Sequence, residues 1–184
     1  TTYRRSTACF GSADSDLPIV FNEYMHLSWD SPEESRTHEL VSLAAKYGVD
    51  IYVIDCGWHD EVDGSKIHPY VGKWRESKVR FPHGLKNMTD YIRACGMKAG
   101  LWIEPEVLGT LSGEEYPEEA YIHANGQRVC VSGRYFLDFR HGEVRRRLDD
   151  AIERMINEYG AEYIKIDCNQ DCGPGTEIDS NSLG

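Results

Sequence analysis

The amino-acid sequence predicts an α/β fold in which parallel strands alternate with helices. Three amphipathic segments have the apolar spacing of helices, and each is followed at once by a short, strongly apolar stretch that is typical of a buried strand. A fourth apolar stretch precedes the first helix, so the expected order is strand and helix three times and then a strand. This alternation favours a parallel sheet covered by helices.

The three expected helices have start and stop signals as well as apolar stripes. The first begins near Ser31, where Glu34 would complete a capping box; the second spans residues 84–95, and the third spans 142–160. A glycine ends each of them. The stripes are Leu40, Val41, Ala44 and Tyr47; Leu85, Met88, Ile92 and Cys95; and Val144, Leu148, Ile152, Met155 and Tyr159.

Each expected strand ends in a polar residue. The strands are residues 18–22, 50–55, 97–104 and 161–167, and their last residues are Asn22, Asp55, Glu104 and Asp167. Parallel strands bring these ends to one rim, which is where active sites lie in barrels and open α/β sheets. Segments 57–83 and 105–134, rich in Gly, Pro and charge, are interpreted as long functional loops on that rim.

A (β/α)8 barrel has eight such units and roughly 250 residues. This chain of 184 residues supplies about four units. We therefore expect residues 18–184 to be the first half of a catalytic barrel in a longer polypeptide, and residues 1–17 to be an N-terminal extension or linker. The alternative is a complete four-stranded α/β domain, which would leave its last strand without a helix.

Composition excludes several classes of function. A formal net charge of −11 disfavours nucleic acid as a partner, and no apolar run approaches the ~20 residues of a membrane helix. The six cysteines form no Cys-x-x-Cys pair, so no structural metal site is expected. Scattered cysteines suit a reducing compartment, and we expect a cytoplasmic protein. An open sheet exposes two strand edges, which allows a homo-oligomer.

Lys165 and Asp167 are the first candidates for chemistry. They are two positions apart on a strand, so they point to the same face, towards the barrel interior, while Ile164 and Ile166 point towards the helices. Charged groups in that position are costly unless paired. A purely stabilising salt bridge is the alternative, but the rim position and the acids on neighbouring strands favour a functional role.

Further residues at the rim are candidates for substrate binding. Asp55 ends the second strand, and its alternative role is to cap the following turn. Glu104 and Glu106 place two carboxylates after the third strand, where they could contact hydroxyl groups or be solvated loop charges. Asn22 is equally well explained by turn formation.

Aromatic rings beside these acids suggest a carbohydrate ligand. Trp58 and Trp74 lie in the loop after the second strand, and flat rings are common platforms for the apolar faces of sugars. Packing within the loop is the alternative for both. Trp102 shares an inward face with Glu104 and would form the floor of a pocket or part of the core.

Four motifs occur along the chain in one order. They are Asp55-Cys-Gly-Trp58, Lys78-Val-Arg-Phe-Pro-His-Gly-Leu85, Gly96-Met-Lys-Ala-Gly-Leu-Trp-Ile-Glu-Pro-Glu106 and Tyr163-Ile-Lys-Ile-Asp-Cys-Asn169. With this order and spacing, residues 18–175 resemble the bacterial α-galactosidase (melibiase) family, glycoside hydrolase family 36.

The resemblance implies a retaining exo-glycosidase that needs no cofactor and no metal. It assigns the nucleophile to Asp167 and sugar binding to Lys165 and Asp55, and it implies that the general acid/base lies beyond Gly184. Cys56, Trp58, Trp102, Glu104 and Asn169 complete the expected substrate-binding set. An oligosaccharide with a terminal α-galactosyl or related sugar is the expected substrate.

Two residues depart from the family pattern. Cys56 stands where the family usually has a second Asp, and Gln170 stands where it usually has Arg. Both changes affect sugar binding more than the reaction, so three alternatives to α-galactosidase stay open. These are an α-N-acetylgalactosaminidase, a galactosyl transferase similar to raffinose synthases, and a non-catalytic carbohydrate-binding fragment.

Overall fold

Four parallel strands form the central sheet of the computed structural model, which describes residues 17–26, 32–60 and 67–173. The strands are β1 (Val20–Asn22), β2 (Ile51–Ile54), β3 (Lys98–Ile103) and β9 (Tyr163–Ile166), side by side in that order. All three pairings are parallel. The predicted order and direction of the strands are therefore confirmed, and across the described residues the sheet is open and not closed into a barrel.

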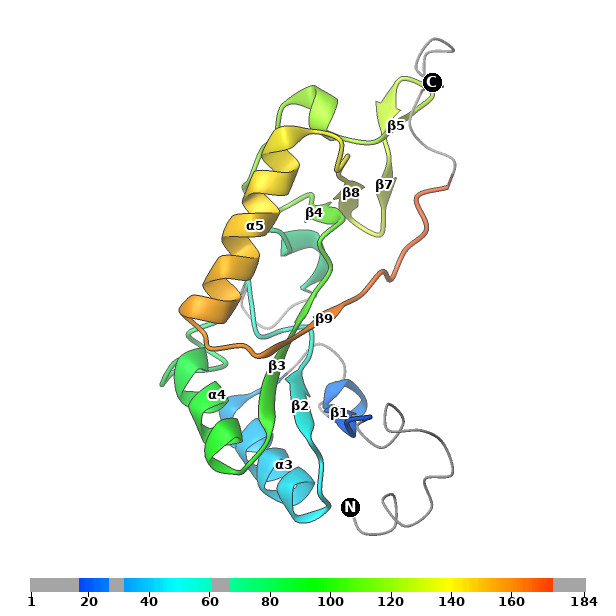
Figure 1. Ribbon diagram of the computed structural model, residues 1–184. Coiled ribbons are helices and arrows are strands. Elements are labelled where there is room, and N and C mark those ends of the chain that lie inside the picture. The colour runs from blue at the N-terminus through cyan, green and yellow to red at the C-terminus, as the bar shows by residue number, and fades with distance from the viewer. Residues whose placement is uncertain (1–16, 27–31, 61–66, 174–184) are drawn as a thin grey trace.

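Three helices bury apolar side chains against the core of this sheet (Figure 1). They are α3 (Glu34–Lys46), α4 (Leu85–Ala94) and α5 (Gly142–Asn157). Helix α5 does so only through its C-terminal half, since its N-terminal half packs beside the region of β4 (Val107–Gly109). Side chains from each predicted stripe are buried, namely Val41 and Ala44, then Leu85, Met88 and Ile92, then Val144 and Met155. All four residues of β2 are buried, as expected for a strand in the interior of a sheet.

The start of α3 differs from the prediction. Its N-cap is Glu33, which makes no side-chain cap, and the predicted cap Ser31 lies outside the described residues. Instead of completing a capping box, the Glu34 carboxylate accepts hydrogen bonds from the backbone N–H of His83, 3.0 Å away, and from its ring. At the other end of the helix, Tyr47 is 79% exposed because it follows the last turn, so its predicted core position was wrong.

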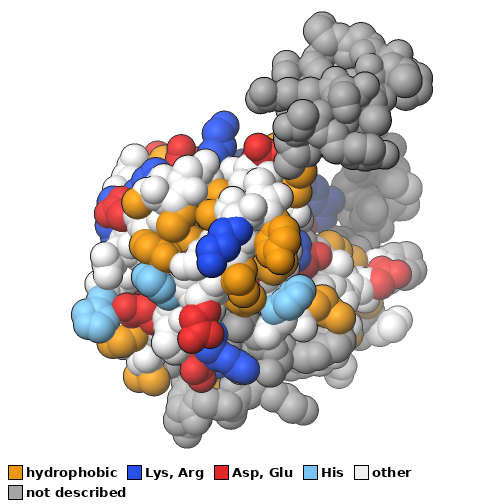
Figure 2. All heavy atoms as spheres, turned by 90° about the horizontal axis from the view of Figure 1, so that it is seen from below, with side chains coloured by type: hydrophobic (Ala, Val, Ile, Leu, Met, Phe, Trp, Pro, Cys, Tyr) orange, Lys and Arg blue, Asp and Glu red, His pale blue; other side chains and the backbone are white. Residues whose placement is uncertain are grey.

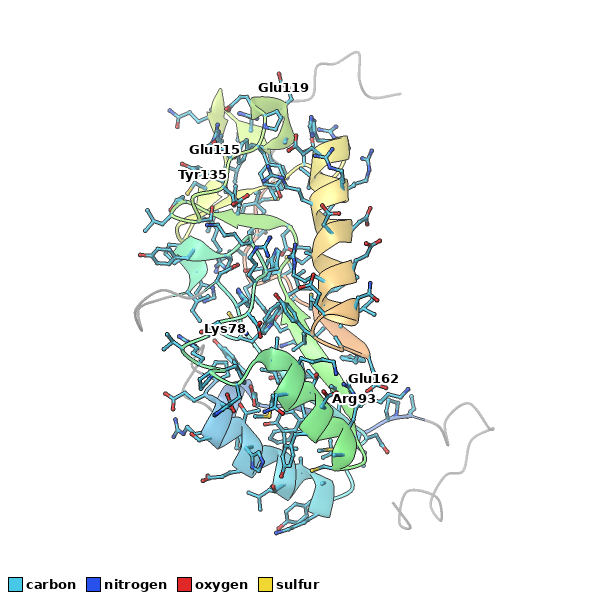
Figure 3. The ribbon with its side chains drawn as sticks, turned by 90° about the vertical axis from the view of Figure 1, so that its left-hand side faces the viewer. Lys78, Arg93, Glu115, Glu119, Tyr135 and Glu162 are labelled. Carbon is cyan, nitrogen blue, oxygen red and sulfur yellow. The ribbon has the colours of Figure 1, made fainter. Side chains whose placement is uncertain are left out.

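Side chains from distant segments hold both ends of α4. The carboxylate of Glu76 accepts a 2.7 Å hydrogen bond from the first helical N–H, at Leu85. Near the other end, Arg93 lies beside Glu162, the residue before β9 (Figure 3), with 3.9 Å between the charged groups. A guanidinium N–H of Arg93 also donates to the carbonyl oxygen of Gly160. These contacts tie α4 to the turn that leads into β9.

The prediction that residues 105–134 form a long loop was wrong. The segment carries short strands that continue to residue 136 and form an antiparallel sheet of three strands beside a two-stranded hairpin. The elements are β4 (Val107–Gly109), η3 (Glu118–Ala120), β5 (His123–Ala124), β6 (Gln127–Arg128), β7 (Cys130–Val131) and β8 (Arg134–Phe136). Two short 3-10 turns, η1 (Tyr24–His26) and η2 (His68–Tyr70), lie outside it.

Two tight turns shape this region: the first joins β5 to β6, and the second joins β7 to β8. Asn125 and Gly126 have φ values of 55° and 72°, and Ser132 and Gly133 have values of 52° and 77°. Two successive residues at positive φ are what a tight hairpin turn requires, and Asn-Gly is a strong hairpin signal. The second turn leads directly into Arg134, which is 1% exposed, and so carries that side chain towards the central sheet.

The outer strands of the central sheet expose apolar side chains. Val20 on β1 and Ile166 on β9 are 43% and 69% exposed. Ile164 packs against the core as predicted, whereas Ile166 does not meet a helix layer, because no described helix covers that end of β9. On the face seen from below, apolar side chains are interspersed with charged ones (Figure 2). No described helix is long and apolar enough to cross a membrane.

Candidate active site

A hollow of about 340 Å³ lies where β2, β3 and β9 end. Six of the eight predicted site residues line it: Asp55, Cys56, Trp102, Lys165, Asp167 and Asn169. They come from three strands because the parallel register sets Trp102 of β3 beside Lys165 of β9. Five further residues complete the lining: Tyr24, His68, Ser132, Arg134 and Gln170.

Lys165 bridges two carboxylates in this hollow. Its Nζ atom lies 2.8 Å from Asp55 Oδ2 and 3.4 Å from Asp167 Oδ2. Partial burial would lower the pKa of Lys165, but the hydrogen bond and charge of Asp55, together with the charge of Asp167, raise it overall. The amide of Asn22 also donates to Asp55, so this nearly buried carboxylate has two donors and is held in place.

Asp167 is a half-buried carboxylate with donors on both oxygens. Oδ2 accepts a 2.9 Å hydrogen bond from Trp102 Nε1, and Oδ1 accepts one from the backbone N–H of Cys168 at 2.9 Å. Partial burial acts to raise its pKa, but the Trp102 hydrogen bond and the Lys165 charge lower it below the usual range. Asp167 is therefore ionised at neutral pH, with 30% of its side chain exposed.

Glu104 does not line the hollow, which corrects the prediction that it contacts substrate. Its side chain is fully buried and forms a 2.5 Å ion pair with Arg134. Its other oxygen accepts a 3.1 Å hydrogen bond from the backbone N–H of Asn169. Glu104 thus holds two residues that do line the hollow, and Arg134 is a site residue that the sequence interpretation missed.

Trp58 and Trp74 are packed in the interior. The prediction that they form a platform for a sugar was therefore wrong, and the alternative, packing, holds for both. Trp58 is 0% exposed and Trp74 is 5% exposed. The Trp58 indole donates a 2.8 Å hydrogen bond to the carbonyl oxygen of Trp102. Of the three, Trp102 lines the hollow, although it is only 1% exposed and also belongs to the core.

Glu106 faces a second hollow. It lies there with Cys168 and Asn169, on the other side of the segment that follows β9. Burial, more than any other cause, raises the pKa of its carboxyl group. Asn169 and Gln170 line both hollows, whereas Glu106 lines the second but not the one around Asp167.

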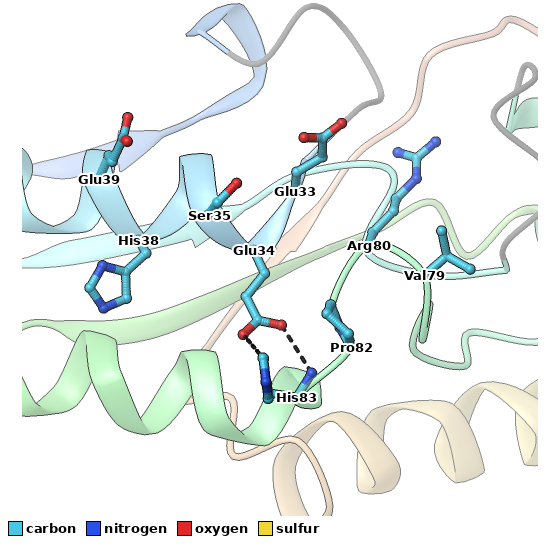
Figure 4. Close-up of a pocket in the computed structure, with 9 residues that line it drawn as sticks. All are labelled: Glu33, Glu34, Ser35, His38, Glu39, Val79, Arg80, Pro82 and His83. Atoms are coloured by element: carbon cyan, nitrogen blue, oxygen red, sulfur yellow. Dashed lines mark hydrogen bonds and ion pairs between the residues drawn. The ribbon is translucent and has the colours of Figure 1, made fainter.

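A larger hollow, of about 630 Å³, lies between α3 and the segment before α4 (Figure 4). Of its three carboxylates, Glu34 is engaged by His83, and none of the eight predicted site residues lines this hollow. Within residues 17–26, 32–60 and 67–173, no group of three His, Cys, Asp or Glu side chains could hold a metal ion. The chemistry of interest is therefore at the hollow around Asp167.

Comparison with known proteins identifies the family. Residues 2–183 match the melibiase family. This chain belongs to the melibiase family. Alpha-galactosidase Mel36A of Lactobacillus acidophilus is 31% identical over 162 residues, which are 85% of this chain and 21% of that protein. Alpha-galactosidase AgaA of Geobacillus stearothermophilus is 26% identical over 183 residues, 98% of this chain and 24% of the relative.

Solved structures have the same fold as this melibiase-family chain. A crystal structure of a Geobacillus stearothermophilus AgaA variant in complex with raffinose superposes with a TM-score of 0.73 at 22% identity, covering 100% of this chain and 25% of that one. The alpha-galactosidase of Lactobacillus brevis gives 0.67 at 24% identity over 82% of this chain. The chain spans about a fifth to a quarter of the length of these relatives.

Proposed function

We propose that this chain is the nucleophile-bearing half of a (β/α)8 barrel in a retaining exo-glycosidase that hydrolyses terminal α-galactosides. Membership of a family whose similar members are named α-galactosidases supports the substrate class. AgaA structures with bound raffinose and stachyose support an oligosaccharide substrate. The observation that carries the proposal is the geometry of Asp167, an ionised carboxylate held by Trp102 and Lys165 at the rim of the hollow.

We assign Asp167 the role of nucleophile in a double displacement. The free lone pairs of Asp167 attack the anomeric carbon, and the bond to the leaving-group oxygen breaks while a second carboxyl group protonates that oxygen. The resulting glycosyl ester is hydrolysed by water, which the second carboxylate deprotonates. We place that residue beyond Gly184, because Glu104 is tied to Arg134 and Glu106 faces another hollow.

Binding of the sugar is assigned to the remaining lining residues. Lys165 and Asp55 supply a donor and an acceptor for hydroxyl groups, and the nearly buried Trp102 lines the hollow beside them. Arg134 adds a second cation to the lining. Cys56 stands where the family usually has an Asp. A thiol is smaller than a carboxylate and carries no charge, so we assign to Cys56 the choice between galactose and N-acetylgalactosamine.

Asp167→Asn in the full-length protein tests the nucleophile. Turnover of an aryl α-galactoside should fall by about 10³-fold or more, because a covalent nucleophile is lost, while the fold is unchanged. Added azide should restore turnover and give a β-galactosyl azide. Asp149→Asn, the same change at an exposed position of α5, is the matched control. Activity above about a tenth of wild type would reject the assignment.

The stereochemistry is tested separately. NMR of the first product should show α-galactose before mutarotation, as two successive displacements retain the configuration. Release of β-galactose first would leave the α-galactosidase assignment in place and overturn the double-displacement mechanism.

A further inference from the structure

His59 is a fully buried histidine that packs against three indole rings. Its ring lies 4.6 Å from that of Trp74, 4.9 Å from that of Trp58 and 5.6 Å from that of Trp102. With Trp102 the two rings are nearly parallel, at 8°. The side chain is 0% exposed and is not among the residues that line the hollow.

Asp60 anchors this imidazole. Three backbone N–H groups, of Gly72, Lys73 and Trp74, donate to its Oδ2 atom at 2.9–3.1 Å, and that of Arg75 donates to Oδ1 at 3.3 Å. The His59 Nδ1 atom lies 3.3 Å from the same carboxylate. A carboxylate with so many backbone donors is fixed in position, and it fixes the ring that contacts it.

The imidazole is explained by this contact better than by packing. Its Nε2 atom is buried and has no hydrogen-bond partner among the described residues, which is unfavourable. A phenyl ring would fill similar space without an unpaired nitrogen. The advantage of histidine here is the Nδ1 group, which sets the angle of the ring against Trp102.

Trp102 connects this cluster to the reaction centre. One face of its indole meets His59, and its Nε1–H donates 2.9 Å to Asp167 Oδ2. Its backbone is held as well, because Trp58 donates to the Trp102 carbonyl oxygen. A rotation of the indole would move the N–H off the carboxylate, since hydrogen bonds weaken steeply away from linearity.

We propose that His59 is a positioning residue for Asp167, acting through the indole of Trp102. This inference rests on the proposed role of Asp167 as nucleophile. Held between Asp60 and the indole, the imidazole keeps the Trp102 N–H aimed at Asp167 Oδ2. That hydrogen bond stabilises the ionised carboxylate and fixes the oxygen that does not attack.

His59→Met and His59→Gln in the full-length protein test this role. Both remove the flat ring, and glutamine keeps a donor for Asp60. The acidic limb of the kcat/KM–pH profile should move up by about half a unit to one unit, as the carboxylate loses a well-aligned donor. We expect kcat to fall about tenfold with KM within about twofold, because the loss acts on the transition state. His59→Phe keeps a ring but loses the Nδ1 contact that sets its angle, so it should also shift the limb.

The other ionisable groups near Asp167 are unchanged in these variants, so their loss cannot cause the shift. They are Lys165, Asp55, Glu104, Glu106 and Cys168. His38→Met is the matched control, because His38 also stacks on an aromatic ring, that of Tyr91 at 3.7 Å, but lines the distant hollow of Figure 4. Its profile should equal that of wild type.

A second background separates positioning from general damage. In Trp102→Phe, which has no N–H, replacement of His59 should cause no further movement of the limb. An unchanged limb in folded His59→Met and His59→Gln, or an equal shift in the Trp102→Phe background, overturns the inference. If instead Asp167→Asn keeps its activity, the proposed function itself fails, so the two failures are distinguishable.

Discussion

The ammonium group of Lys165 lies 2.8 Å from the carboxylate of Asp55, although 110 residues separate them in the chain. The contact forms because β2 and β9 are both parallel to β3 and end at the same rim. Because the Lys165 ammonium group lies between Asp55 and Asp167, its positive charge offsets the repulsion between the two carboxylates. The position of Lys165, and with it the ionisation of Asp167, therefore depends on Asp55 at the end of another strand.

Lys165→Met should therefore move the acidic limb of kcat/KM to higher pH. Asp167 must be ionised to attack, and Lys165 is one of the groups that hold its pKa below the usual range. Without the ammonium group, protonation extends to higher pH and kcat/KM falls about tenfold or more. Lys86→Met, on the exposed face of α4, is the control. A limb at the same pH in both variants would contradict the bridging role.

Cys56→Asp should change substrate choice. Cys56 is 2% exposed and lines the hollow beside Asp55, so a carboxylate there would add an acceptor and a charge next to the sugar. The ratio of kcat/KM for an α-galactoside and an α-N-acetylgalactosaminide should change by about tenfold or more. Equal ratios in the variant and the wild type would show that the thiol takes no part in discrimination.

Glu104→Gln should destabilise the protein strongly. The change leaves the Arg134 guanidinium buried without its counter-charge, which costs on the order of 3 kcal/mol in the free energy of unfolding. Asp90→Asn, which breaks an exposed ion pair with Lys86, should cost at most about 1 kcal/mol. Urea unfolding of the two variants makes the comparison, and similar losses would mean that the buried pair contributes no more than the exposed one.

Glu23→Gln should make the protein more stable above neutral pH. Burial raises the pKa of Glu23 to about 8, while its side chain accepts hydrogen bonds from Tyr52 and Thr37. The folded state keeps this proton when the unfolded state loses it near pH 4.5, so stability declines as pH rises from about 4.5 to about 8.

Glutamine cannot ionise, and the variant should escape that decline. Its advantage over wild type in urea unfolding should be absent at pH 4.5 and reach on the order of a few kcal/mol at pH 8. Glu39→Gln, on the exposed surface of α3, controls for the general effect of removing a charge. A constant difference between Glu23→Gln and wild type across this range would show that Glu23 is ionised in the folded protein.

The sequence alone determined the α/β repeat and the residues at the rim. Helices and strands have local apolar patterns that can be recognised without a structure. Examples are the helical stripe Leu85, Met88 and Ile92 and the apolar strand Ile51–Ile54. The alternation of side chains along a strand placed Lys165 and Asp167 on one face. Asn125-Gly126 has the sequence of a hairpin turn, but the strands on either side are only two residues long, which is too short for an alternating pattern.

Only the tertiary structure decided which of these residues face the hollow. Glu104 and Asp55 both end strands, yet Glu104 is buried against Arg134 while Asp55 meets Lys165. The difference arises from the β4–β8 sheet, which brings Arg134 back over the end of β3. In the same way, Trp58 looks like an exposed aromatic in the sequence but packs inside. Burial and pairing depend on contacts between residues far apart in the chain, and such contacts leave no periodic signal in the sequence.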